Sequence, residues 1–135
     1  MRRTLLRVYI HLVWATHRRE PRLDELLAPT VHECLWRRSL ELGATPRALG
    51  GVEDHVHLLL AMPSTCSLAQ LVNELKGTSS HAANRLQPGP VPFRWQGAYA
   101  AFSVDEGRLE VVRGYIARQR EHHRRQIPGG WELDA

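Results

Sequence analysis

Lysine is almost absent from this chain, because Lys76 is the only lysine among 18 basic residues and all the others are arginine. Cysteine is scarce too, and the wide separation of Cys34 and Cys66 excludes a closely spaced zinc-ligand motif and fits reduced thiols. No apolar run approaches the roughly 20 residues that a membrane-spanning helix needs. The basic first residues are not followed by the apolar core of a signal peptide, so we expect a cytoplasmic protein without a membrane partner.

The excess of arginine is the main compositional feature of these 135 residues, which we expect to form one domain over 1–135. The net charge is +4, and the planar guanidinium group pairs with phosphate through two hydrogen bonds. A GC-rich genome would also raise the arginine content, so composition alone leaves both explanations open. Clustering favours phosphate binding. The clusters are Arg18, Arg19 and Arg22, and Arg118, Arg120, Arg124 and Arg125.

Hydrophobic periodicity predicts seven elements in the order β-α-β-β-α-β-α. Strands are expected over residues 5–14, 45–53, 55–62 and 93–104. A first helix is expected to begin at residue 23 or 29 and end at residue 42. Two capping boxes, Ser67 with Gln70 and Ser103 with Glu106, predict where the second and third helices begin. This order is typical of the α+β, ferredoxin-like (split βαβ) fold, a mainly antiparallel sheet with helices on one face, here followed by a further C-terminal helix.

His55 and His57 are two residues apart in a run that reads as a buried strand. Residues at this spacing share one face of a strand, while Val56, Leu58 and Leu60 would face the other way. Two neighbouring imidazoles are half of a divalent-metal site. The alternative is a pair of satisfied histidines at the end of a sheet, which is the more common situation for an isolated pair.

The last helix places a phenol, a side-chain amide and an imidazole on one stripe, since Tyr115, Gln119 and His122 are spaced by one helical turn. This stripe lies beside the core face formed by Val112 and Ile116. A tyrosine next to a core face commonly only packs there. The accompanying amide and histidine, in a basic helix, favour a functional role instead.

These motifs resemble the HUH single-tyrosine transposases of small insertion sequences that move as single-stranded DNA, a family that includes the repeat-associated tyrosine transposases. The resemblance extends over nearly the whole chain, and its blocks follow one another in the family's order. The blocks are Val13-Trp14-Ala15-Thr16, the stretch 50–59 around His55 and His57, Leu75-Lys76-Gly77-Thr78-Ser79-Ser80, the stretch 95–104 that begins with Trp95-Gln96, and the stretch 115–123 that begins with Tyr115.

The resemblance implies an enzyme that cleaves and rejoins single-stranded DNA through a 5′-phosphotyrosine link. His55, His57 and Gln119 would hold one Mg²⁺ or Mn²⁺, and Tyr115 would be the nucleophile, so that Tyr115, His55 and His57 are the expected catalytic residues. His122 is a candidate for assisting the tyrosine.

The resemblance also implies its partners: single-stranded DNA folded into hairpins, and a second copy of the chain in a homodimer whose subunits could share active sites. Trp95 could equally belong to the core. The residues expected to contact nucleic acid are Arg18, Arg19, Lys76, Arg94, Trp95 and Arg118.

Two alternatives stay open from the sequence. A non-catalytic module that only binds hairpins would need none of the four site residues, which argues against it. A domesticated, repeat-associated DNA nickase would have the same site as a mobile transposase. A histidine-triad hydrolase would need a third histidine where this chain has Leu59.

Overall fold

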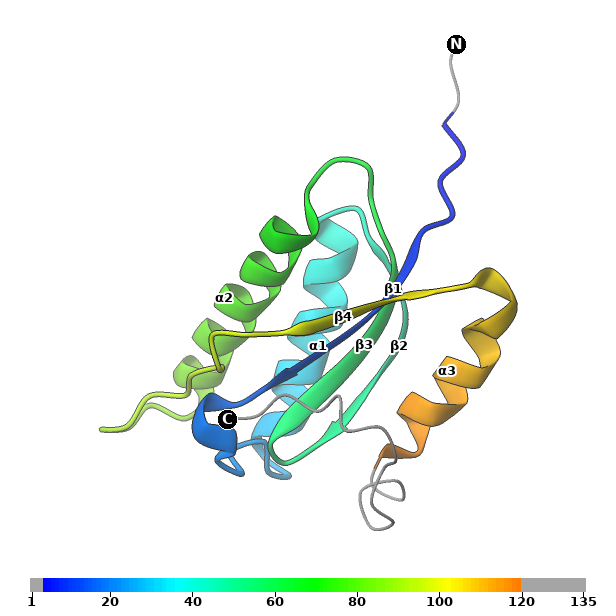
Figure 1. Cartoon of the computed structure of the whole chain (residues 1–135). Coiled ribbons are helices and arrows are strands. Elements are labelled where there is room, and N and C mark those ends of the chain that lie inside the picture. The colour runs from blue at the N-terminus through cyan, green and yellow to red at the C-terminus, as the bar shows by residue number, and fades with distance from the viewer. Residues whose placement is uncertain (1–3, 120–135) are drawn as a thin grey trace.

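In the computed structural model, which describes residues 4–119, four strands form one antiparallel sheet in the order β2-β3-β1-β4 (Figure 1). The strands are β1 (Tyr9–Ala15), β2 (Thr45–Val52), β3 (His55–Ala61) and β4 (Ala100–Val104). β1 and β3 are the two central strands, and each has a paired neighbour on both sides. The predicted α+β fold with an antiparallel sheet is confirmed.

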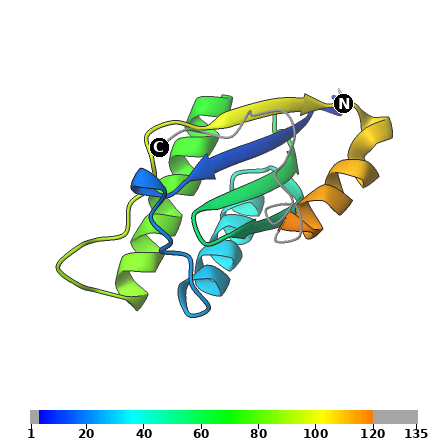
Figure 2. The same cartoon turned by 60° about the horizontal axis from the view of Figure 1, so that its bottom comes forward.

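The helices cover both faces of the sheet. α1 (Leu27–Glu41) and α2 (Leu68–Leu86) pack against each other on one face, while α3 (Leu109–Ala117) contacts β2 and β3 from the other, as Figures 1 and 2 show. Two short 3-10 helices, η1 (His17–Arg19) and η2 (Glu106–Arg108), follow β1 and precede α3. α3, which carries Tyr115, therefore lies on the face of the sheet opposite α1 and α2.

Alternation along β1 and β3 separates two cores, as a strand period of two requires. The larger core lies beneath α1 and α2, and its strand residues are Leu12, Trp14, Val56, Leu58 and Leu60. The smaller core lies beneath α3 and is formed by Tyr9, Leu59, Leu109 and Ile116. The predicted assignment of Val56, Leu58 and Leu60 to the face opposite the histidines is confirmed.

Local signals set the ends of α1 and α2. Ser67 Oγ accepts a hydrogen bond from the backbone N–H of Gln70, and the backbone N–H of Ser67 donates to Gln70 Oε1, so the predicted capping box is present. α2 runs without interruption through Gly77. After α1, Gly43 adopts a φ of +88°, a conformation that glycine tolerates and other residues rarely adopt.

Two predicted strand boundaries are wrong. β1 begins at Tyr9 rather than at residue 5, and the fourth strand begins at Ala100 rather than at residue 93. In the segment before β4, the ammonium group of Lys76 binds the carbonyl oxygens of Gln96 and Ala98. Instead of a strand ladder, the segment forms an isolated bridge between Trp95 and Thr16, with one backbone hydrogen bond on either side of it.

The second predicted capping box is also absent. The side chain of Asp105, rather than that of Ser103, caps η2 by accepting a hydrogen bond from the backbone N–H of Gly107. Asp105 immediately precedes the turn that leads into α3, so its carboxylate reaches the exposed N–H groups directly.

Within residues 4–119, no helix has both the length and the apolar character needed to cross a membrane.

Candidate active site

His55 and His57 project from β3 toward the face of the sheet that α3 covers. Both are buried, with 3% and 1% of their surfaces exposed, and their ring centroids lie 5.1 Å apart. The predicted placement of the two imidazoles side by side on one face is therefore present.

A carboxylate holds one nitrogen of His55. Asp54 Oδ1 lies 2.7 Å from His55 Nδ1, and Asp54 Oδ2 lies 3.3 Å from Nε of Arg19. The hydrogen bond with His55, followed by the charges of His55 and Arg19, holds the pKa of Asp54 below its usual value. Carboxylate–histidine pairs of this kind fix the imidazole of a metal ligand, which then binds through its other nitrogen. Nε2 is thus the atom through which His55 would bind a metal.

A third histidine holds His57 in the same way. His11, on β1, is 7% exposed, and its Nε2 lies 2.9 Å from His57 Nδ1. Burial lowers the pKa of His11 to about 4, so His11 is neutral at physiological pH. A neutral His11 can accept a hydrogen bond from His57 Nδ1–H, which leaves Nε2 as the ligating atom of His57. Neither His11 nor Asp54 was among the site residues predicted from the sequence.

α3 brings Tyr115 to these histidines within one chain. Its half-buried ring packs edge-on against His57 and His11, with ring centroids 5.7 and 6.2 Å apart. The predicted phenol on the helix and the predicted imidazoles on the strand, almost 60 residues apart in sequence, therefore lie in contact.

Gln119 follows α3 and is 2% exposed. Its Nε2 donates to the backbone oxygen of Tyr115 at 3.1 Å, whereas its buried Oε1 has no hydrogen-bond partner among the described residues. A buried acceptor without a partner costs about 1–3 kcal/mol, and a cation would satisfy it. Gln119 lines a pocket together with Gly50 of β2, the residue that pairs with His57.

These observations fit a divalent ion held by His55, His57 and Gln119. Two imidazole nitrogens and one amide oxygen are ligands that Mn²⁺ accepts, and amide oxygen also suits Mg²⁺. Residues 4–119 contain no group of three or more His, Cys, Asp or Glu side chains arranged to hold a metal. The candidate ligand set thus depends on the amide of Gln119. His122 lies outside the described residues.

Gly50 allows α3 to approach the sheet closely. A Cβ atom built on Gly50 would lie 2.6 Å from the backbone oxygen of Ile116, which is closer than real Cβ contacts. Ile116 stands between Tyr115 and Ala117 at the end of α3. Because glycine has no side chain, α3, which carries Tyr115, can approach β2 this closely.

The residues predicted to contact nucleic acid have different environments, and such contact stays a prediction for all of them. Arg18 and Arg94 are exposed and line one pocket, while Arg19 pairs with Asp54. Arg118 is exposed, and its guanidinium group lies over Gly114.

Lys76 and Trp95 are more involved in the fold than the sequence indicates. Burial lowers the pKa of Lys76, whose ammonium group donates to two backbone oxygens. Trp95 Nε1 donates to Ser79 Oγ at 2.9 Å, and the indole ring packs edge-on against Trp14 and Phe93. Trp14 is completely buried in the larger core.

Solved structures that resemble the chain in fold include two described as transposases. A candidate transposase from Deinococcus radiodurans R1 is 27% identical, with a TM-score of 0.71, and the match covers 88% of this chain and 95% of that one. A REP-associated tyrosine transposase bound to a REP hairpin is 14% identical, with a TM-score of 0.66, and the match covers 98% of this chain and 74% of that one. The second likeness supports the fold alone. No curated protein matches the sequence.

A family model described as "Transposase IS200 like" matches residues 4–119. The match includes the two histidines of β3, the tyrosine of α3 and the glutamine that follows it. Because it spans most of the 135 residues, the chain belongs to the IS200-like transposase family.

Proposed function

We propose that this transposase cleaves and rejoins single-stranded DNA at hairpin-marked ends, with Tyr115 as the nucleophile and a divalent metal ion as the cofactor. The observation that carries the proposal is the contact between the Tyr115 ring and His57, whose ring centroids are 5.7 Å apart. A tyrosine that only packs against a core face does not need two buried histidines beside it, each with its Nδ1 atom in a hydrogen bond.

In the proposed reaction, the phenolic oxygen of Tyr115 attacks phosphorus and forms a P–O bond, while the bond from phosphorus to the 3′ oxygen of the preceding nucleotide breaks. The phenolic proton passes to solvent or to a neighbouring base, and the leaving 3′ oxygen takes up a proton from solvent. The products are a 5′-phosphotyrosine and a free 3′-hydroxyl group. The phosphotyrosine preserves a phosphodiester-like bond. A second 3′-hydroxyl can therefore reverse the step and join new DNA ends without ATP.

His55, His57 and Gln119 would hold the ion, either Mg²⁺ or Mn²⁺. A bound ion stabilises negative charge on the scissile phosphate and on the leaving oxygen. Asp54 and His11 would keep the two imidazoles oriented, because each is hydrogen-bonded to Nδ1 of one ligand. The hydrogen bond from Gln119 Nε2 to the backbone of Tyr115 directs Oε1 away from that carbonyl and links the third ligand to the nucleophile's helix.

Hairpin DNA is proposed as the substrate because one structure of similar fold holds a REP hairpin. A homodimer is proposed from the resemblance of the sequence to its family. The Tyr115–His57 contact supports a site in which both halves come from one chain.

The decisive experiment incubates the protein with hairpin-bearing single-stranded DNA and Mn²⁺, and then looks for a protein–DNA adduct that survives denaturation. We expect an adduct with the unmodified chain and none with Y115F, which removes only the attacking oxygen. An adduct in Y115F would contradict the assignment of the nucleophile.

A chelator tests the role of the metal separately from that of the tyrosine. We expect EDTA to abolish the adduct and added Mn²⁺ to restore it. Adduct formation that is equal in EDTA would remove the metal role from His55, His57 and Gln119. Tight hairpin binding without any adduct, under every metal tested, would favour the binding-only alternative.

A further inference from the structure

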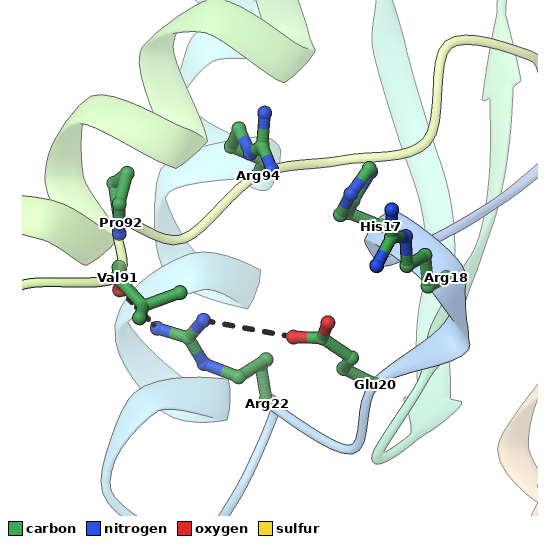
Figure 3. Close-up of a pocket in the computed structure, with 7 residues that line it drawn as sticks. All are labelled: His17, Arg18, Glu20, Arg22, Val91, Pro92 and Arg94. Atoms are coloured by element: carbon green, nitrogen blue, oxygen red, sulfur yellow. Dashed lines mark hydrogen bonds and ion pairs between the residues drawn. The ribbon is translucent and has the colours of Figure 1, made fainter.

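A basic pocket lies where the loop after β1 meets the segment before β4. Its volume is about 200 Å³. Figure 3 shows the two segments enclosing it from different sides, and the lining residues are His17, Arg18, Glu20, Arg22, Val91, Pro92 and Arg94. Three arginines and one glutamate are among the lining residues, so the charged side chains of the pocket are net positive.

The three arginines of the pocket differ in their contacts within residues 4–119. Arg22 donates to the backbone oxygen of Val91 at 3.2 Å and lies 4.0 Å from the carboxylate of Glu20. By contrast, Arg18 and Arg94 are exposed, and no described residue forms a hydrogen bond or ion pair with either side chain. Their positive charges are available to a ligand.

The frame that carries these arginines is ordered by backbone hydrogen bonds. The N–H of His17 donates to the carbonyl oxygen of Arg94 at 2.9 Å, and the N–H of Gln96 donates to the carbonyl oxygen of Ala15 at 2.9 Å. A bridge between Thr16 and Trp95 lies between them. Arg18 and Arg94 therefore stand on two segments that are fixed relative to each other.

The same loop reaches the histidine site. Arg18 and Arg19 both have a φ of 54°, in the left-handed region that arginine rarely adopts. Residues held in this region cost free energy, and they cluster at active sites and ligand-binding loops. Arg19 pairs with Asp54, which holds His55, whereas Arg18 lines the pocket. Two adjacent residues thus connect the pocket to the proposed metal site.

We propose that this pocket binds a backbone phosphate of the single-stranded DNA next to the nucleotide that is cut. The inference rests on the proposed function and adds a second point of attachment for the strand. Arg18 and Arg94 would form charge-assisted hydrogen bonds to the phosphate oxygens, and the apolar wall of Val91 and Pro92 would lie beside the sugar. Anchoring a neighbouring phosphate fixes the position of the scissile one, which is the benefit of orientation in catalysis.

The test measures the affinity for a fluorescein-labelled oligothymidylate of 20 nucleotides by anisotropy, over a range of salt concentrations. Phosphate contacts are independent of base sequence, so this probe needs no knowledge of the recognised site. We expect R18Q/R94Q to raise Kd about 10-fold and to lower the slope of log Kd against log salt by about 0.7, the value for one phosphate contact to a single strand.

A matched control separates the pocket from overall charge. R37Q/R108Q removes the same two charges from exposed positions on α1 and η2, outside the pocket, and we expect a change in Kd below about 3-fold. R18K/R94K keeps both charges but loses the planar fork, so its salt slope should stay near that of the unmodified chain. Thermal melts of each variant confirm that it is folded.

The outcomes distinguish the pocket from the proposed function. Equal weakening by R18Q/R94Q and R37Q/R108Q would contradict the pocket proposal while leaving the tyrosine chemistry untouched. Inorganic phosphate that competes with the strand only in chains that retain Arg18 and Arg94 would support the pocket. If the unmodified chain bound no single strand at all, the proposed function would fail and the pocket proposal would fail with it.

Discussion

His11 Nε2 lies 2.9 Å from Nδ1 of His57, and both side chains are buried between the sheet and α3. The two residues belong to neighbouring strands, β1 and β3, in which Val13 is the direct partner of His57. His11 is therefore the diagonal neighbour of His57 on the same face. The contact makes His11 a positioning residue, since it touches a proposed metal ligand and has no assigned contact with the metal or the substrate.

Replacing His11 with phenylalanine should weaken metal binding. The H11F substitution leaves the N–H at Nδ1 of His57 buried without its acceptor, and loss of an orienting partner typically lowers metal affinity about 10- to 100-fold. H11Q supplies an amide oxygen that can accept this hydrogen bond, so it should restore part of the affinity. Isothermal titration with Mn²⁺ measures both. H81Q changes an exposed histidine of α2 and is the control, which should bind Mn²⁺ normally. Normal Mn²⁺ binding by H11F would show that His11 only packs against His57.

The stability of the metal-free protein should fall as the pH decreases from about 6.5 to 4. Burial lowers the pKa of His11 in the folded chain to about 4, while the unfolded chain keeps the usual value near 6.5. Between these values the unfolded chain binds the proton and the folded chain does not, so protons favour unfolding. The loss approaches about 3 kcal/mol, from 1.36 kcal/mol for each pKa unit.

Urea unfolding at several pH values measures this dependence. H11F has no group to titrate at position 11, and its stability should therefore vary less over the same range. Burial also lowers the pKa of His32, so some dependence of the same sign should persist in H11F. Identical slopes for the two proteins would show that His11 is protonated as easily in the folded chain as in the unfolded one.

Alternation along a single strand could be predicted from the sequence, but contacts between strands could not. The two faces of β3 follow from the period of two, so the placement of His55 and His57 was correct. The contact of His11 with His57 depends on the register of β1 against β3. No tight turn joins these two strands to set that register, and the alternation along each strand determines only its two faces. The sequence did contain a signal for His11. It is a third histidine in an apolar strand, two residues from both Tyr9 and Val13 and therefore on the same face as they are.

The segment before β4 shows the opposite case, where local propensity was misleading. Aromatic residues there favour a strand, yet the carbonyl oxygens of Gln96 and Ala98 bind the ammonium group of Lys76. Likewise, residues 5–8 are apolar enough for a strand, but β1 forms ladder pairs only from Tyr9, whose partners are Ala61 and Val104. Tertiary partners decide where a strand begins.

Adding a methyl group at Gly50 should displace α3 and impair the reaction. In G50A the new Cβ would meet the carbonyl oxygen of Ile116 at 2.6 Å, so the helix must move outward. Overpacking of this kind costs about 1–3 kcal/mol. A shift of about 1 Å in the nucleophile can reduce rates about 100-fold, so adduct formation should fall more than stability explains.

G77A is the matched control for G50A. Gly77 is exposed within α2 and an added Cβ has nothing within 4 Å, so alanine should raise the free energy of unfolding by about 0.5–1 kcal/mol. Adduct formation should be unchanged in G77A. Normal adduct formation in G50A at equal folded fraction would mean that α3 need not sit as close to β2 as it does.

Mixing two inactive variants should show whether an active site belongs to one chain or to two. The ring of Tyr115 packs against His57 of its own chain, so a site assembled this way needs both residues on the same molecule. Y115F and H57Q, co-expressed so that any dimers contain both, should then give no more adduct than either variant alone.

Shared sites predict a different result. In a dimer that exchanged its tyrosine helices, each mixed dimer would combine the intact tyrosine of one chain with the intact histidine of the other. Half of the dimers would be mixed, so about a quarter of the normal adduct would return. Recovery at that level would show that α3 of one chain serves the sheet of its partner, and that the contact within a single chain is replaced on assembly. Neither variant changes Gly50 or Ile116, so the close contact between α3 and β2 can form in either arrangement. The experiment therefore compares the two arrangements directly.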